Sequence, residues 1–298
     1  MNRFIKLSLT FAIFLISAHS SFGQVKTYKF AQRDTTALFL DVYQPKEAIR
    51  KNICVLYVFG GGFVTGSRQE EKNVEFFNDM ANRGYTVVAI DYRLGLKGAS
   101  KVGAFNPKPA FKAVEMATED LVSATSFIIE NNKTLGIDPK RIVIIGSSAG
   151  AITALQTDYE LANRSALVKE LPQDFHFAGV VSLAGALFSE TGNPRYSSTP
   201  APTLFYHGTK DKTVVYNKLK VFRKGMFGTK ALVKIFNKGR YKYMAIKYKN
   251  MKHEVAVFPR FYMQDNICNF IDMAITGKYD NELDITIKDR KIQSKYKY

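Results

Sequence analysis

Cysteine, tryptophan and long apolar runs are all scarce in this chain of 298 residues. Cys54 and Cys268 are the two cysteines, and there is no tryptophan. Two cysteines are far too few for a disulfide-stapled scaffold, so stability must come from a buried core. An oxidising compartment would permit a bond between them, but two buried free thiols are the interpretation that we favour. After residue 23, no apolar run reaches the roughly 20 residues that span a bilayer.

Acidic side chains are also in short supply. The chain has 43 Lys and Arg residues against 26 Asp and Glu, which gives a formal net charge of +17. Much of the excess lies late, in residues 238–252 and in residues 288–298 of the tail. A basic surface attracts anionic polymers or acidic substrates, although a solvated basic face is the simpler interpretation. No nucleic-acid-binding motif accompanies the charge, so we expect no nucleic-acid partner. We also expect no cofactor and no metal.

The first 23 residues have the pattern of a signal peptide. Arg3 and Lys6 precede an apolar run, residues 7–16, and small residues follow up to Gly23. A positive start, a short apolar run and small residues before the cut are the three parts of such a signal. We therefore expect an exported protein, periplasmic or secreted, with no stable membrane insertion after cleavage. An N-terminal anchor that is never cut is the alternative.

Short β-rich runs then alternate with helical patterns, which is typical of a mostly parallel sheet with helices on both faces. We predict one α/β domain at 24–280 with an eight-stranded sheet and an antiparallel hairpin at its edge, no room for a large cap domain, and a basic tail at 281–298. Strands are expected at 25–31, 37–43, 52–59, 85–90, 141–146, 177–184, 203–207 and 243–248, and helices at 69–83, 111–131, 149–159, 229–238 and 260–276. Gly, Pro and Ser mark 95–109 and 185–202 as loops.

Ser148 lies at the junction between a predicted strand and an Ala-rich helix. The segment Gly146-Ser147-Ser148-Ala149-Gly150 follows the strand directly. A glycine two positions before and after the serine allows the sharp turn that presents a nucleophile at the carboxyl edge of a sheet. The neighbouring Ser147 lacks this spacing. The sequence therefore predicts Ser148 as the nucleophile.

The glycine triplet Gly60-Gly61-Gly62 directly follows the first buried strand. Backbone N–H groups without side chains beside them can approach the oxyanion of a tetrahedral intermediate. We expect Gly61 and Gly62 to donate to it, with the N–H of Ala149 at the start of the helix completing an oxyanion hole. For a lone glycine triplet, a flexible turn is the alternative.

Three histidines after residue 23 are candidates for the general base: His176, His207 and His253. His176 precedes a predicted strand, and His207 ends one, where it is placed to buttress the next loop. His253 lies in a polar loop after the last strand and is the base that we predict. Asp211 follows the penultimate strand and is predicted to accept the imidazole N–H, with the adjacent Glu254 as its rival.

These motifs resemble the α/β-hydrolase superfamily, and within it the carboxylesterase and lipase-like branch related to hormone-sensitive lipase. The resemblance covers nearly all of the chain after the signal. It rests on FGGGF at 59–63, Asp91-Tyr92-Arg93-Leu94, Asp120, LGIDPKRIVIIGSSAGA at 135–151, HGTKDKTV at 207–214 and KHE at 252–254.

The chain departs from that pattern in three places. Phe59 stands where the family often has His, and Gly95-Leu96-Lys97 stands where it often has Ala-Pro-Glu. The connection from Asp211 to His253 also holds an extra basic segment, residues 218–224. We expect Phe59 to pack against the glycine loop, and we carry over no subfamily's substrate preference.

Motifs and resemblance together predict a serine hydrolase that cleaves carboxylic esters through an acyl-enzyme. A small-molecule or carbohydrate-linked ester is the expected substrate. An exopeptidase of the same fold is one alternative, although such enzymes usually carry a propeller or cap domain. A catalytically silent cell-surface binding protein that uses the basic tail is the other. Phe63, Phe105 and Phe188 are candidates for an apolar substrate pocket, with a packing role as the equal alternative.

Overall fold

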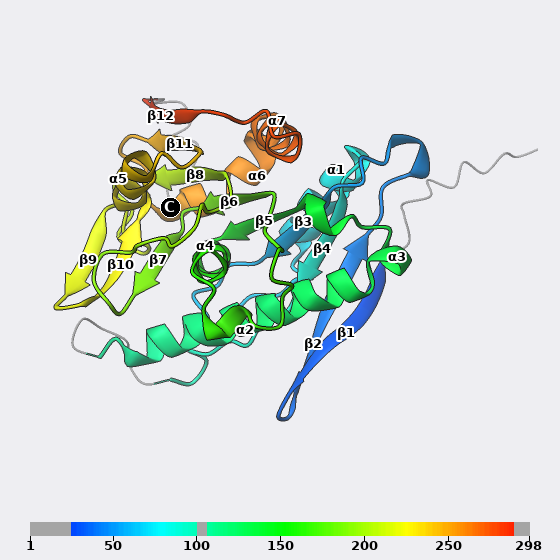
Figure 1. Cartoon of the computed structure of the whole chain (residues 1–298), viewed down its shortest axis with the longest axis horizontal. Coiled ribbons are helices and arrows are strands. Elements are labelled where there is room, and N and C mark those ends of the chain that lie inside the picture. Colours follow the sequence, from blue (N-terminus) through cyan, green and yellow to red (C-terminus); the bar gives the residue numbers. More distant parts are fainter. Residues whose placement is uncertain (1–24, 100–105, 289–298) are drawn as a thin grey trace, which may run out of the picture.

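A twisted central sheet organises the molecule, and helices cover both of its faces (Figure 1). The computed structural model describes residues 25–99 and 106–288. The predicted signal peptide, Phe105 and the last ten residues lie outside this part of the chain. In the described part, no helix is long and apolar enough to cross a membrane.

The sheet has nine strands, and all neighbours from β4 to β12 are parallel. β1 and β2 form the expected antiparallel hairpin at one edge, and β2 also pairs antiparallel with β4. In spatial order the strands are β1 Lys26–Arg33, β2 Thr36–Tyr43, β4 Thr86–Ile90, β3 Cys54–Val58, β5 Ile142–Ser147, β6 Gly179–Leu183, β8 Thr203–Gly208, β11 Tyr243–Tyr248 and β12 Glu282–Ile287. Every residue of β3, β4, β5 and β6 is buried, as near-continuous apolar runs predict.

Two helix layers enclose the sheet (Figure 1). α1 (Glu71–Asn82) and α7 (Gln264–Ile275) lie side by side on one face, joined by an Arg83–Asp265 ion pair and a Gln264–Asp79 hydrogen bond. α2 (Lys108–Glu130) and α4 (Ala149–Ala162) pack together on the other face. The remaining helices are α3 Asn132–Leu135, α5 Thr229–Gly239, α6 Pro259–Tyr262 and the 3-10 turns η1 Glu47–Ile49, η2 Pro139–Arg141, η3 Ala166–Val168 and η4 His253–Ala256.

The sheet has one strand more than the eight expected, because β12 adds to β11 from within residues 281–298. Five of its six residues are exposed, so the sequence carries no buried alternation that would reveal it. A second, three-stranded antiparallel sheet also forms, from β7 Ala186–Ser189, β10 Lys224–Gly228 and β9 Lys218–Val221. The prediction of an uninterrupted loop over 185–202 was therefore wrong at β7. The predicted helix at 260–276 is interrupted at Met263.

Buried polar contacts fix the edge of the sheet nearest the hairpin. Asp120 in α2 is fully buried and accepts hydrogen bonds from Arg33 Nε at 3.1 Å and from Arg93 Nε at 2.9 Å. The motif residues Arg93 and Asp120 thus tie α2 to the segment after β4. Cys54 and Cys268 are buried free thiols, as we favoured from the sequence.

Candidate active site

Ser148 sits in the sharp turn between β5 and α4 and has a strained backbone, with φ 52° and ψ −115°. Positive φ is unusual for a residue with a side chain and is held here by the surrounding packing. A Cβ on Gly146 would lie 2.2 Å from the Gly150 carbonyl oxygen, and one on Gly150 would lie 2.1 Å from that of Val58. Glycine at both flanks is therefore a steric requirement of this turn.

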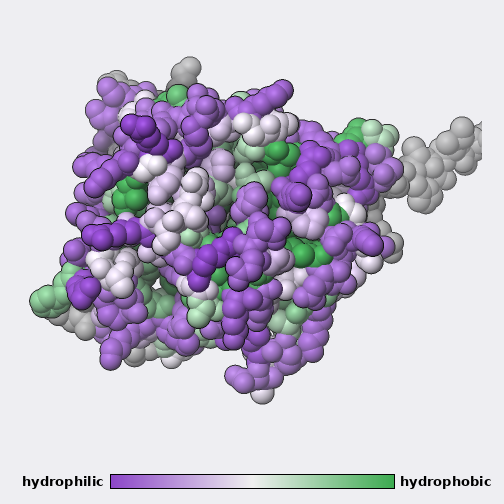
Figure 2. Space-filling view, viewed as in Figure 1, coloured by the Kyte–Doolittle hydropathy of each residue, from purple (hydrophilic) through white to green (hydrophobic). Residues whose placement is uncertain are grey.

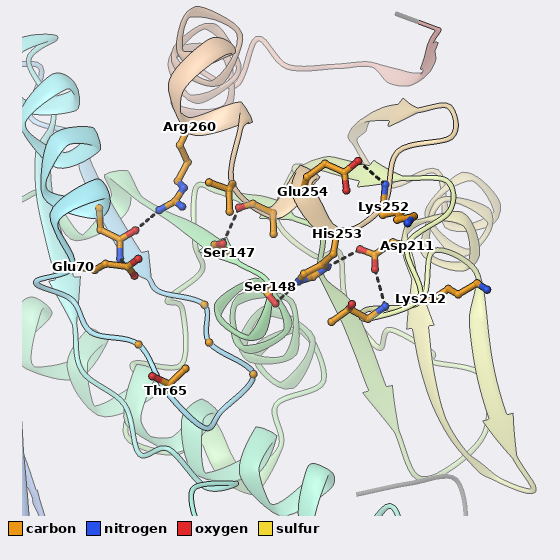
Figure 3. Close-up of a pocket in the computed structure, with 18 of the residues that line it drawn as sticks. Thr65, Glu70, Ser147, Ser148, Asp211, Lys212, Lys252, His253, Glu254 and Arg260 are labelled. Atoms are coloured by element: carbon orange, nitrogen blue, oxygen red, sulfur yellow. Dashed lines mark hydrogen bonds and ion pairs between the residues drawn. The ribbon is translucent and has the colours of Figure 1, made fainter. Parts of the chain in front are cut away.

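The structure brings together the three side chains that the sequence singled out. Ser148 Oγ lies 2.8 Å from His253 Nε2, and His253 Nδ1 lies 2.7 Å from Asp211 Oδ2 (Figure 3). Ser148 and His253 are partly exposed, whereas the Asp211 side chain is fully buried. Three residues from three separate loops thus form one line of hydrogen bonds that ends at an accessible hydroxyl.

Asp211 is held on both carboxylate oxygens. Oδ1 accepts the backbone N–H groups of Thr213 and Val214 at 2.9 and 3.1 Å, and Oδ2 faces His253. Burial raises the pKa of this carboxyl, but hydrogen bonds from His207 and His253 outweigh burial and lower the pKa to about 2. The carboxylate is therefore ionised at neutral pH.

The other candidates have different surroundings. His207 is fully buried, with Nδ1 2.9 Å from Thr229 Oγ1 and Nε2 3.0 Å from the Val214 carbonyl oxygen, so it buttresses the Asp211 loop as expected. His176 is exposed, and its Nδ1 lies 3.2 Å from the Asp174 carbonyl oxygen. Glu254, the rival of Asp211, accepts the backbone N–H of Lys252 instead.

Ser147, the rival nucleophile, is turned away from the imidazole. Its hydroxyl is buried and donates to the Ala256 carbonyl oxygen at 2.8 Å. This bond ties the end of β5 to η4, the turn that begins at His253. Ser147 therefore positions the turn that carries the imidazole and does not compete for it.

The glycine loop lies directly beside the turn at Ser148. A Cβ on Gly60 would lie 3.0 Å from the Ser147 carbonyl oxygen, and one on Gly61 would lie 1.9 Å from the Thr65 carbonyl oxygen. Phe59 stacks on Tyr92 with ring centroids 4.4 Å apart, and the Tyr92 hydroxyl donates to the Phe59 carbonyl oxygen at 3.0 Å. As expected, Phe59 packs beneath this loop.

A cavity of about 1490 Å³ opens above Ser148. Its walls include the glycine loop, the start of α1, the segment after β8 and the η4 to α6 segment (Figure 3). Phe63 and Phe188 do not line it, which corrects that prediction. Phe63 is buried against Tyr92, and Phe188 lines a second cavity beyond α4. Phe105 falls outside the described residues.

Several lining residues gave no signal in the sequence. Arg260 and Asn73 reach the cavity from α6 and α1, and Lys210, Lys212 and Lys252 stand beside Asp211 and His253. The sequence predicts Arg260 as the first residue of the helix at 260–276, and an arginine most often faces solvent. Among the described residues, no group of His, Cys, Asp and Glu has the arrangement of a metal site.

Sheet order, helix layers and the serine turn together define the α/β-hydrolase fold, and comparison with known proteins agrees. The BD-FAE family model matches residues 40–187, just under half of the chain, and the chain is similar in sequence to esterases and carboxylesterases. The structure resembles esterase 2 of Thermogutta terrifontis with a TM-score of 0.59 at 18% identity, over 86% of this chain and 96% of that one.

Sequence relatives match a shorter stretch. Gut esterase 1 of Caenorhabditis briggsae is 35% identical over 120 residues, which are 40% of this chain and 20% of the relative. Ethyl acetate hydrolase of Pseudomonas putida is 29% identical over 141 residues, 47% of this chain and 38% of the relative. The chain thus spans well under half the length of these relatives.

Proposed function

We propose that this protein is a serine hydrolase that cleaves carboxylic esters, with Ser148 as nucleophile, His253 as general base and Asp211 as the residue that orients the base. The observation that carries the proposal is the pair of hydrogen bonds from Ser148 Oγ to His253 Nε2 and from His253 Nδ1 to Asp211 Oδ2. Relatives and structural neighbours named as esterases support the same class of reaction.

Asp211 determines which imidazole nitrogen acts. An ionised carboxylate accepts a hydrogen bond, so Nδ1 of His253 carries the proton and Nε2 presents a lone pair to the Ser148 hydroxyl. Nε2 takes the serine proton as Oγ attacks the ester carbonyl. The tetrahedral intermediate then collapses, the imidazolium protonates the leaving alkoxide, and an acyl-serine remains. Water repeats the sequence, with His253 again as base, and releases the carboxylic acid.

Gly61, Gly62 and Ala149 are the donors that we propose for the oxyanion. Gly61 and Gly62 line the cavity beside Ser148. Their φ values of 127° and 65° are positive, a backbone conformation that favours glycine. Ala149 is the first residue of α4, and the first N–H groups of a helix have no partner within it. Such donors gain strength where they meet developing negative charge.

The direct test compares Ser148→Ala, His253→Ala and Ser147→Ala with the unaltered protein on para-nitrophenyl acetate. The first two variants should lose about 10³-fold or more in kcat. Ser147→Ala should retain far more activity because Ser147 bonds to Ala256 and not to the imidazole. Unchanged turnover by Ser148→Ala would reject the proposal.

Ester and amide substrates separate the proposal from the exopeptidase alternative. An amino-acyl para-nitroanilide should be cleaved far more slowly than the corresponding para-nitrophenyl ester. Comparable rates would favour a peptidase. Failure to cleave any ester by correctly folded protein would favour the silent binding protein.

We further propose export with removal of residues 1–23. Arg3 and Lys6 before the apolar run at 7–16, and the small residues up to Gly23, support it. Intact-mass measurement of the protein recovered from a host that secretes it should show a chain that begins near residue 24. A full-length chain would contradict cleavage.

A further inference from the structure

Among the described residues, one arginine is buried, and this residue, Arg260, lies in the wall of the Ser148 cavity. Its side chain comes from α6, and the residue is 5% exposed. Nη1 donates to the Tyr57 hydroxyl at 2.5 Å and also to Asn73 Oδ1. Nε has no hydrogen-bond partner, and Nη2 makes no hydrogen bond to a described residue. Because Nε is buried and Nη1 is already bonded, Nη2 is the nitrogen available to a ligand in the cavity.

No carboxylate of the described residues lies within ion-pair distance of Arg260. Arg33, Arg68 and Arg93, which are less buried, all pair with aspartates. A buried charge without a counterion is costly unless something else compensates it. Tyr57 and Asn73 are neutral partners, and the exposed Glu70, whose Oε2 lies 3.5 Å from Asn73 Nδ2, forms no ion pair with Arg260.

Three lysines extend this positive field to the mouth of the cavity. Lys210, Lys212 and Lys252 line it on the side of Asp211, and the ammonium groups of Lys212 and Lys252 point away from Ser148 (Figure 3). Two further acids line the cavity besides Asp211: Glu70, which is exposed, and Glu254, which bonds to the backbone N–H of Lys252. Four basic and three acidic side chains thus line the cavity, a small positive excess that lies at Arg260 and at the lysines, where it can attract anions.

We infer that the ester substrate carries a carboxylate, which Arg260 binds while Ser148 attacks the ester carbonyl. This inference rests on the proposed ester hydrolysis and names its substrate class. The N–H groups of Nη2 would donate charge-assisted hydrogen bonds to the carboxylate. The carboxylate belongs either to the acid or to the alcohol half of the ester, and both sources share the same chemistry at Arg260.

Paired esters test the inference and identify the source. For the acid half, the mono-para-nitrophenyl ester of adipic acid is compared with para-nitrophenyl hexanoate. For the alcohol half, para-acetoxybenzoate is compared with para-acetoxybenzamide. In at least one pair, kcat/KM should be higher for the anionic ester by about tenfold. Rising salt should reduce that advantage because it screens the lysines at the mouth.

Variants assign the preference to particular residues. Arg260→Gln should lower the ratio of anionic to neutral kcat/KM about tenfold or more, and Arg260→Lys should restore part of it. Glu70→Gln removes an exposed acid from the same cavity and should raise the ratio a few-fold. Lys140→Gln is the matched control, since Lys140 is exposed in η2, before β5 and at the opposite edge of the sheet, and the ratio should not change.

The two proposals fail in different ways. Ester hydrolysis that depends on Ser148, with no preference for either anionic ester and no effect of Glu70→Gln, would overturn the carboxylate site and leave the serine hydrolase intact. Loss of all Ser148-dependent turnover would overturn the hydrolase itself. If Arg260→Gln does not fold, Glu70→Gln and the salt series still decide, because both act on protein with Arg260 in place.

Discussion

His207 Nε2 lies 3.4 Å from Asp211 Oδ2, the same oxygen that faces His253 Nδ1 at 2.7 Å. His207 is fully buried at the end of β8 and contacts Thr229, the first residue of α5. The imidazole of His207 thus supports the loop that carries Asp211, and Asp211 orients the imidazole of His253. His207 Nε2 also bonds to the Val214 carbonyl oxygen, which fixes the same loop a few residues after Asp211.

Replacing His207 should therefore impair catalysis through Asp211. We expect His207→Leu to lower kcat about tenfold with a small change in KM, because substrate contacts remain and the orientation of His253 loosens. Steady-state kinetics on a neutral ester separate these two parameters. An increase in KM alone would contradict a positioning role, and circular dichroism would check the fold.

Asp211→Asn should lower kcat by about 10³-fold or more, because the amide favours the wrong imidazole tautomer. It should also change the pH dependence of stability. The folded pKa of Asp211, about 2, lies below the value of about 3.9 for an unfolded aspartate, so the carboxylate stabilises the fold above about pH 4. That contribution, on the order of 2 kcal/mol, is lost as the pH falls towards 2.

Urea unfolding at several pH values measures this loss. The free energy of unfolding of the unaltered protein should fall more between neutral and acid pH than that of Asp211→Asn. Equal slopes in the two proteins would contradict the lowered pKa.

Gly150→Ala should destabilise the protein by about 1–3 kcal/mol or prevent folding, because the new methyl group would lie 2.1 Å from the Val58 carbonyl oxygen. Gly277→Ala is the control for crowding, since a Cβ there has no neighbour within 4 Å, although its φ of 66° adds some strain. Thermal unfolding compares the two. A smaller effect at Gly150 than at Gly277 would contradict close packing of α4 against β3.

Asp120→Asn should lower the free energy of unfolding by about 3 kcal/mol, because it leaves Arg33 and Arg93 without their buried counterion. Asp265→Asn breaks the exposed pair with Arg83 and should have an effect below about 1 kcal/mol. Denaturant titration of both variants checks the contrast. Similar small losses would show that the Asp120 cluster does not hold α2 in place.

Much of the central architecture was predictable because it depends on local signals. The buried strands β3, β4, β5 and β6 are recognisable in the sequence as apolar runs. The turn at Ser148 is recognisable by its two flanking glycines, because a side chain at either position would clash with the backbone. The positions of Asp211 and His253 follow from the rule that loops after parallel strands meet at one sheet edge.

Other features depend on contacts between distant segments. β12 and the lysine-containing β9 have no buried residue to reveal them, and β10 is a five-residue strand with two glycines, which are unfavourable in a strand. Arg260 enters the cavity because α6 ends after four residues and α7 begins anew after Met263. The sequence shows no break there. Packing against Tyr57 and Asn73 determines where the guanidinium points.

Covalent labelling tests the central claim most directly. A fluorophosphonate should react with the protein in a one-to-one ratio, and mass spectrometry of the digest should place the adduct on Ser148. The label should disappear in Ser148→Ala and persist in Ser147→Ala. No label on natively folded protein, or an adduct on another residue, would contradict the assignment of Ser148 as nucleophile.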